Sequence, residues 1–204
     1  MTYTPGKIVC VGRNYVEHAR EMGNEIPKEP LLFFKPPSSV IRQGEHIVLP
    51  KVSTHVEFEG EIALVIGTRL RKASEAEARA GISHVVALND VTARDLQKID
   101  NQWARAKGMD TFCPIGELAP VPDDLSSLTV VTRVNGVECQ RGSAADMAFA
   151  IPTLIAYISQ FITLEPGDLI ATGTPAGTKK LEPGDTVEVE IVGLSRVANP
   201  VVAG

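Results

Sequence analysis

The chain has 204 residues, of which 44% are hydrophobic and 22% charged, and its formal net charge at pH 7 is -5. This composition is that of a globular protein, and a chain of this length can bury about 70% of the surface that it exposes when unfolded. Because the charge is modestly negative and no run of five like charges occurs, we expect neither nucleic acid nor an anionic membrane as a partner.

The N-terminal residues and the cysteines indicate a compartment. Residues 1–7 lack the basic and then apolar stretch of a secretory signal, and no apolar run approaches the ~20 residues of a membrane span. We therefore expect a cytoplasmic protein.

The cysteines are odd in number and far apart, which argues against a disulfide framework or a cysteine-based zinc site. We expect three free thiols, with the first of them in the core: Cys10, Cys113 and Cys139.

The first predicted elements are a strand at residues 8–11 and a glycine-bounded helix at residues 12–23, which Asn14 can cap. In such a helix His18 and Glu21 lie on one face, so the carboxylate can hold the imidazole in the tautomer that a general base needs. An exposed charged pair without a catalytic role is the alternative, and this pattern alone leaves it open.

The segment at residues 58–67 carries the most specific pattern. Side chains of a strand alternate between two faces, so Glu59 and Glu61 share a face at a separation of roughly 7 Å, from which both carboxylates can reach one cation. The segment is otherwise apolar on both faces, and a buried unpaired carboxylate is unfavourable. Gly60 between them marks a bulge or a close approach. A solvated acidic strand end remains an equally weighted alternative.

The next two predicted elements are a helix and a strand. Ser74 and Glu77 fit a capping box at the start of the helix, and the apolar strand at residues 84–88 is followed by Asp90. Asp90 offers a third oxygen ligand, and three carboxylates without cysteine favour a hard cation such as magnesium or manganese. A turn or capping role is the alternative for Asp90.

The remaining predicted elements are mainly short strands. One further helix, with a proline in its first turn, is predicted at residues 152–161. Short runs rich in β-branched, aromatic or other apolar residues predict strands at residues 31–35, 128–134, 169–172 and 186–192. Because no linker or composition shift divides the chain, we expect one α+β domain over residues 1–204, built from curved, mixed sheet with a few short helices.

A second pair of glutamates provides a comparison within the chain. Glu188 and Glu190 alternate strictly with apolar neighbours, as in a strand with one polar and one buried face. We expect this pair to be solvated.

Six segments resemble motifs of the fumarylacetoacetate hydrolase family, in the same order and over nearly the whole chain: residues 10–15, 33–36, 58–61, 89–97, 106–114 and 172–177. The resemblance is closest to the compact acylpyruvase and oxaloacetate decarboxylase branch. It implies a mixed β-sheet roll, a homodimer and a bound divalent ion, Mg²⁺ or Mn²⁺, with Ca²⁺ as a further option.

The resemblance also implies roles for individual residues. The implied metal ligands are Glu59, Glu61 and Asp90. The implied catalytic residues are a water-activating dyad on a lid and a lysine: His18, Glu21 and Lys107. The positions that match the family's substrate-binding residues are Arg94, Gln97 and Thr174, and Arg13 is a weaker candidate for contact with the substrate.

These roles imply an enzyme acting on a small 2-oxo or 2-hydroxy-2-enoic acid. The first expectation is C–C hydrolysis of an acylpyruvate through a metal-stabilised pyruvate enolate. The alternatives are decarboxylation of oxaloacetate, keto-enol tautomerisation and isomerisation of 2-hydroxyhepta-2,4-diene-1,7-dioate. A non-catalytic metal-binding or carboxylate-binding module is the rival from another class; the presence of His18, Glu21 and Lys107 together argues against it.

Overall fold

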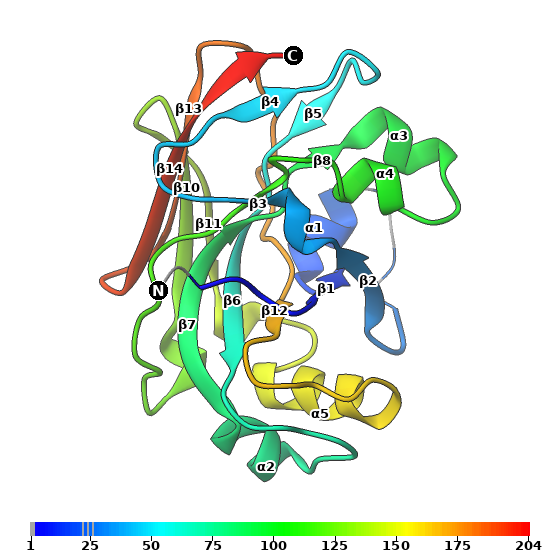
Figure 1. The fold of residues 1–204 in the computed structure, drawn as a ribbon, viewed down its shortest axis with the longest axis vertical. Coiled ribbons are helices and arrows are strands. Elements are labelled where there is room, and N and C mark those ends of the chain that lie inside the picture. The colour runs from blue at the N-terminus through cyan, green and yellow to red at the C-terminus, as the bar shows by residue number, and fades with distance from the viewer. Residues whose placement is uncertain (1–2, 22, 24, 26) are drawn as a thin grey trace.

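The computed structural model describes residues 3–21, 23, 25 and 27–204. Within these residues, most of the strands belong to two five-stranded sheets, whose arrangement can be followed in Figure 1. The first sheet has the strand order β2 (Leu31–Lys35), β1 (Ile8–Gly12), β12 (Leu169–Ala171), β6 (Gly60–Ile66) and β7 (Ile82–Asn89). Its β1–β12 pair is parallel and its other pairs are antiparallel.

The second sheet packs against β6 and β7 of the first. Its strand order is β11 (Val137–Ser143), β10 (Thr129–Val134), β13 (Thr186–Ile191), β14 (Ser195–Ala203) and β4 (Ile47–Leu49). Two short ribbons join the loops around the sheets, β3 (Val40–Ile41) with β9 (Cys113–Pro114) and β5 (Val56–Glu57) with β8 (Thr92–Ala93). The fold is therefore α+β and dominated by mixed sheet, as the sequence predicts.

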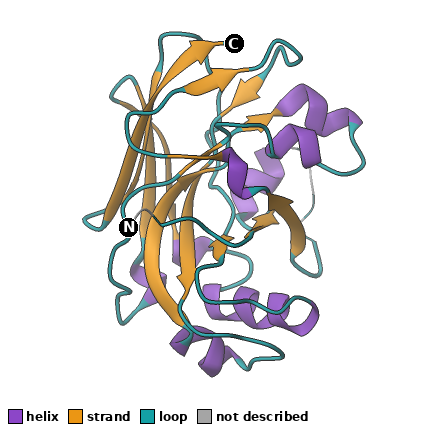
Figure 2. Ribbon diagram, viewed as in Figure 1, coloured by secondary structure: helices purple, strands orange, loops and turns teal. Residues whose placement is uncertain are grey.

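Five short helices lie outside the sheets (Figure 2): α1 (Val16–Glu21), α2 (Glu75–Ala80), α3 (Arg94–Ile99), α4 (Ala104–Lys107) and α5 (Ile151–Phe161). This count of five helices covers residues 3–21, 23, 25 and 27–204. Single 3-10 turns occur at Pro37–Ser39, Leu125–Ser127 and Ala144–Asp146. The helices α2 and α5 pack together at the end of the molecule opposite α3 and α4 (Figure 1). None of the helices within the described ranges is long and apolar enough to span a membrane.

Both faces of β6 are buried, and this burial extends to the carboxylates at the start of the strand. Ile62, Leu64 and Ile66 join the core between the two sheets. Ala63 and Val65 face the other side and pack in a separate apolar cluster with Cys10 of β1. Glu61 shares the face of Ala63 and Val65 and is itself buried. The carboxylates at the start of β6 are thus inside the protein and are not a solvated strand end.

Most predicted elements are confirmed. The strands agree to within about two residues at their ends, the Ser74–Glu77 capping box is formed, and α5 has its proline in the first turn. The three cysteines are free, and Cys10 is buried.

The predicted helix at residues 12–23 differs. Its described part begins only at Val16. The Asn14 side chain bonds to main-chain atoms of Phe149 and Thr172. Tyr15, whose carbonyl accepts from the N–H of Ala19, occupies the capping position. Part of the predicted segment, at residue 22, lies outside the described residues.

Candidate active site

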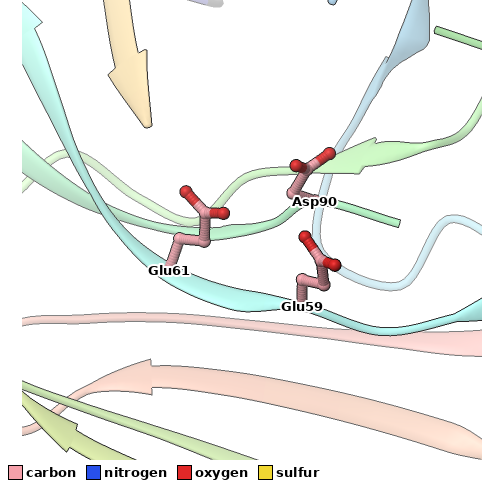
Figure 3. Close-up of side chains that lie close together, drawn as sticks. All are labelled: Glu59, Glu61 and Asp90. Carbon is pink, nitrogen blue, oxygen red and sulfur yellow. The ribbon is translucent and has the colours of Figure 1, made fainter. Parts of the chain in front are cut away.

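Three carboxylates converge where β6 begins and β7 ends, as Figure 3 shows. Glu59 directly precedes β6, Glu61 is its second residue, and Asp90 directly follows β7. The antiparallel pairing of Gly60 with Asn89 places Asp90 beside Glu59, and the Asp90 N–H donates to the Glu59 carbonyl over 2.8 Å. One oxygen atom from each carboxylate lies within 4.8 Å of the other two. The predicted metal ligands are therefore brought together.

Gly60 allows the second sheet to approach from behind. A Cβ atom at this position would lie 1.9 Å from the hydroxyl oxygen of Thr132 in β10. The Gly60 N–H donates to Gln140 Oε1 over 3.0 Å, and its carbonyl accepts from the Thr174 hydroxyl over 2.9 Å. Gln140 donates in turn to Thr174 Oγ1 over 2.8 Å. The main chain between Glu59 and Glu61 is thus held on both sides, which fixes the direction of the two carboxylates.

Buried cations surround two of the three carboxylates. Lys107 at the end of α4 donates to Glu59 Oε2 and Asp90 Oδ2, each over 2.6 Å. Lys35 at the end of β2 donates to Asp90 Oδ1 over 2.6 Å. Arg94 Nη2 at the start of α3 donates to Glu59 Oε1 over 2.7 Å. Each of these cations is almost fully buried, so the charges interact in a medium of low effective dielectric constant.

This arrangement moves the pKa of the two glutamates in opposite directions. Burial alone would raise the pKa of Glu59, but the charges of Lys107 and Arg94 outweigh burial and hold it below its usual value. Burial raises the pKa of Glu61 well above its usual value, and the negative charges of Asp90 and Glu59 add to the effect. Burial lowers the pKa of Lys107, but Asp90 and Glu59 outweigh it, so the net pKa is raised and the ammonium is charged.

The chemistry of the three carboxylates fits a hard divalent cation. All three potential metal ligands offer oxygen atoms. A carboxylate oxygen that accepts one hydrogen bond keeps a further lone pair for an ion. Within the described part of the chain, the bond that reaches the Glu61 carboxylate comes from the Gly173 N–H, over 2.8 Å. Glu61 is therefore a buried carboxylate without a cationic partner among these residues, which is the condition that a bound cation relieves.

A cavity of about 330 Å³ opens over Glu59 and Glu61. This volume is at the lower end of the range for small-molecule sites. Its lining includes every predicted catalytic or substrate-binding residue except Glu21: His18, Lys107, Arg13, Arg94, Gln97 and Thr174. Glu21 lies behind His18 and contacts its Nδ1 at 3.3 Å. The Glu21 carboxylate also accepts from the Gly177 N–H, at 3.1 Å for Oε2. The predicted pair is thus formed, with its imidazole buried at the cavity.

The residues at the substrate-binding positions also support one another. Arg94 is held by Glu57 through two bonds of 2.9 and 2.7 Å, and its Nη1 donates to Gln97 Oε1 over 2.6 Å. Burial lowers the pKa of Arg94, but Glu59 and Glu57 outweigh it and raise the net value. Thr174 uses its hydroxyl on Gly60 and Gln140, so this side chain positions the metal-site main chain while it lines the cavity.

Sequence reasoning missed four contributors to this site: Lys35, Glu57, Gln140 and the Gly173 N–H. Lys35 lies inside a motif at residues 33–36 that was recognised without a role for the lysine. A lysine at the end of an apolar strand is a usable signal, since lysine is rarely buried unless paired. Gly173 likewise lies inside the motif at residues 172–177, which was recognised without a role for its N–H. Glu57 and Gln140 carry no local signal, because their role depends on pairing across distant segments.

The comparison pair, Glu188 and Glu190, is on the polar face of β13, as expected, but it is not simply solvated. Arg133 Nη1 donates to both carboxylates at 2.8 Å, and Arg196 contacts Glu188 as well. A cross-strand ion-pair group on the surface thus replaces the expected hydrated pair.

Comparison with known proteins points to one family. Residues 7–202 match the profile described as Fumarylacetoacetate (FAA) hydrolase C-terminal. An Arabidopsis thaliana protein named oxaloacetate tautomerase FAHD1, mitochondrial, is 43% identical over 94% of this chain and 88% of its own length. The 2,4-didehydro-3-deoxy-L-rhamnonate hydrolase of a Sphingomonas strain is 43% identical over 91% of this chain and 70% of its own.

A solved structure shows the same likeness at the level of the fold. The fumarylpyruvate hydrolase of Pseudomonas aeruginosa, in complex with Mn²⁺ and pyruvate, superposes with a TM-score of 0.93. It is 28% identical, and the alignment covers 100% of this chain and 92% of that one.

Proposed function

Because the chain belongs to the fumarylacetoacetate hydrolase family, we propose that it is a divalent-metal-dependent enzyme that hydrolyses a C–C bond of a small acylpyruvate. The observation that carries the proposal is that His18 and Lys107 line the same small cavity as Glu59 and Glu61. A non-catalytic binding module needs the carboxylates alone and has no use for an imidazole held by Glu21 in the same cavity.

The metal site consists of Glu59, Glu61 and Asp90. These residues would hold the ion, which would supply Lewis-acid polarisation to the 2-oxo acid unit of the substrate. The oxygen-only ligands favour Mg²⁺ or Mn²⁺, with Ca²⁺ as a further candidate. The Mn²⁺ in the Pseudomonas fumarylpyruvate hydrolase complex supports this choice.

His18 is the proposed general base. Its Nδ1 faces Glu21, so the carboxylate stabilises the tautomer with a proton on Nδ1 and leaves Nε2 free to accept a proton from water. The water oxygen bonds to the distal carbonyl carbon of the acylpyruvate, and the C–C bond to the pyruvate unit then breaks. The bonding electron pair stays on pyruvate as its enolate, which takes up the proton from His18. The products are a carboxylic acid and pyruvate.

Lys107 and Arg94 contribute positive charge. Two N–H groups of Lys107 are used on Glu59 and Asp90, which leaves the third for an anionic oxygen in the cavity. Arg94 is held by Glu57 and Glu59, so its guanidinium position is fixed before substrate arrives. Charges that need no rearrangement stabilise developing negative charge most effectively. Gln97 and Arg13, also in the lining, are proposed to orient the substrate carboxylate.

Keto-enol tautomerisation of oxaloacetate is the second candidate. It is favoured by the similarity to the Arabidopsis oxaloacetate tautomerase over nearly the whole chain. This reaction needs proton transfer between carbon and oxygen but no attacking water. His18 or Lys107 can transfer the proton, and the reaction does not require a water-activating base held by Glu21. Decarboxylation of oxaloacetate and isomerisation of 2-hydroxydienedioates use the same enolate chemistry and belong in the same assay panel.

Steady-state kinetics on acetylpyruvate, oxaloacetate and its enol, each with Mg²⁺, with Mn²⁺ and with a chelator, test the proposal. We expect chelator-sensitive pyruvate release from acetylpyruvate. Turnover of oxaloacetate alone would replace hydrolysis by the second candidate, and no metal-dependent turnover of any substrate would favour a binding module.

The assembly and location of the protein stay predictions. We propose that residues 1–204 act as one catalytic domain, that the protein is a cytoplasmic homodimer, and that its partner is a small 2-oxo acid. The homodimer rests on the family and on the prevalence of twofold assemblies. Light scattering at micromolar concentration tests it, because a monomer mass would contradict the expectation.

A further inference from the structure

A second cavity, of about 580 Å³, lies beside the candidate active site. The two cavities share three lining residues, Arg13, Phe33 and Trp103. They are therefore adjacent, with these side chains as the common wall. Phe33 and Trp103 are both only partly buried, so neither is fixed on all sides by the core.

The aromatic pair in this wall lies next to Lys107, one of the proposed catalytic residues. The rings of Phe33 and Trp103 meet edge to face, with centroids 5.3 Å apart. The Lys107 ammonium lies 5.0 Å from the centroid of the Phe33 ring. Trp103 is the capping residue of α4, the helix that ends at Lys107, and its carbonyl accepts from the Lys107 N–H over 2.9 Å. One short helix thus presents Lys107 to the first cavity and an indole to the wall.

The second cavity differs from the first in its chemistry. The first is lined by two carboxylates and several cations. The second is formed mainly by apolar side chains of β2 and α4, with two side-chain amides, and Arg13 is the charged residue in its lining as far as the described residues go. Its apolar contributors beyond the shared wall are Leu31, Leu32, Phe34 and Ala104. Such a lining favours an uncharged hydrocarbon group and disfavours a carboxylate, except next to Arg13.

We infer that the second cavity is a subsite for the acyl arm of the substrate, and that the preferred substrates are acylpyruvates with an extended, uncharged acyl or aryl group. This inference rests on the proposed function. The 2-oxo acid unit occupies the first cavity, and the acyl chain passes the Phe33–Trp103 pair into the space beside Phe34. A compact dicarboxylate such as oxaloacetate uses only the first cavity and gains nothing from the second.

A substrate series tests this assignment. The values of kcat/KM are measured for acetyl-, butanoyl- and hexanoylpyruvate, and for succinylpyruvate, which has the length of the butanoyl compound but ends in a carboxylate. We expect kcat/KM to rise by up to about fourfold per buried methylene group. We also expect butanoylpyruvate to exceed succinylpyruvate by about tenfold or more.

Two variants locate the effect in the second cavity. Phe34 lines this cavity and is 49% exposed, so Phe34→Asp introduces a charge there without opening the core. We expect the ratio of kcat/KM for hexanoyl- over acetylpyruvate to fall by about tenfold. Gln102→Glu, a change of nearly equal size at an exposed position of the same cavity, should lower this ratio in the same direction. Phe161→Asp is the matched control, since Phe161 is an exposed phenylalanine that lines neither cavity.

The outcomes separate this inference from the proposed function. Metal-dependent turnover of acetylpyruvate without a rise along the series would refute the subsite alone, as would an unchanged ratio in both Phe34→Asp and Gln102→Glu. A preference for succinylpyruvate would also refute it and would assign Arg13 to a terminal carboxylate. Absence of turnover for every acylpyruvate would refute the proposed hydrolysis and the subsite together.

Discussion

The side chain of Lys35 donates a hydrogen bond to the main-chain carbonyl oxygen of Lys107. The same ammonium donates to Asp90 Oδ1 over 2.6 Å and to the Val91 carbonyl over 3.2 Å. All three donors of a lysine are thus used, and a cation from β2 positions both a proposed metal ligand and the end of the helix that carries Lys107.

Lys35→Met should therefore destabilise the fold strongly. The substitution leaves Asp90 buried beside fewer cations, and removing one partner of a buried ion pair lowers the free energy of unfolding by about 3–5 kcal/mol. Urea unfolding measures the change. Lys180→Met is the control, because Lys180 pairs with Glu182 at the surface, and we expect a loss below about 1 kcal/mol there. Equal stabilities of the two variants would contradict the positioning role of Lys35.

Single amide variants of the three carboxylates should weaken divalent-ion binding. Glu59→Gln, Glu61→Gln and Asp90→Asn each remove a negative charge from the oxygen-only site, so we expect Mg²⁺ and Mn²⁺ affinity to fall by about tenfold or more in calorimetry. Glu188→Gln and Glu190→Gln are matched controls from the surface pair on β13. Unchanged affinity in all three site variants would refute the metal assignment.

Loss of the His18 imidazole should impair hydrolysis more than metal binding. His18→Ala is expected to lower kcat for acetylpyruvate by about a hundredfold or more, as when a general base is removed, and to retain the ion. Glu21→Gln should lower it in the same direction, because the amide no longer favours one imidazole tautomer. His46, an exposed histidine, gives the control variant His46→Ala. Near-wild-type hydrolysis in both dyad variants would exclude the dyad, whereas spared oxaloacetate turnover with lost hydrolysis would support it.

The close approach at Gly60 predicts a compensating pair of substitutions. Gly60→Ala places a Cβ atom 1.9 Å from Thr132 Oγ1, so we expect a loss of about 2 kcal/mol or more in the free energy of unfolding and weaker metal binding. Thr132 Oγ1 has no hydrogen-bond partner within the described ranges, so Thr132→Ala alone should change stability by less than about 1 kcal/mol. The double variant should recover part of the loss. Failure of Thr132→Ala to rescue Gly60→Ala would show that the strain lies elsewhere.

Asp95 predicts a contribution to stability that depends on acid pH. Burial opposes ionisation, but hydrogen bonds from Ser53, Thr54 and the Leu96 N–H together outweigh it and lower the pKa of Asp95 from 3.8 to about 2. Because the folded-state pKa is depressed, the stabilisation is present above about pH 4 and is lost as the pH falls towards 2. Discounted for solvent exposure, it amounts to about 1 kcal/mol. Urea unfolding of the wild type and Asp95→Asn should differ less at pH 3 than at pH 6, because part of the stabilisation is already lost at pH 3; a constant difference would contradict this.

Local pattern predicted much of this molecule, because the relevant signals are encoded over a few residues. The period-two alternation around Glu59 and Glu61 gave their shared face, and the capping box at Ser74 needed only Glu77. Asn14 was wrongly predicted to cap the first helix, because its actual contacts are distant in the sequence. Its best partners are main-chain atoms of Phe149 and Thr172, more than a hundred residues away, and local capping preference cannot reveal that competition.

The ion pairs of the site also could not be predicted from local sequence patterns. Whether Glu59 faces water, a metal or Arg94 depends on which loops fold over the end of β6, and the spacing of residues in the sequence does not specify this. The apolar faces of the strand made burial of Glu59 and Glu61 one of two equally weighted readings of the sequence, the other being a solvated strand end. The identity of the compensating cations followed only from the pairing of β2, α3 and α4 around them.

The position of β12 in the first sheet has a consequence for biosynthesis. This strand inserts between β1 and β6, and Gly173 directly beyond it supplies the N–H that holds Glu61. A nascent chain that has not yet released residues 169–173 from the ribosome therefore has β1 and β6 without the strand that joins them. Contacts of such long sequence separation form slowly. The edges of β1 and β6 stay exposed until then, so the proposed metal site should form abruptly and late in synthesis, when the whole fold is complete.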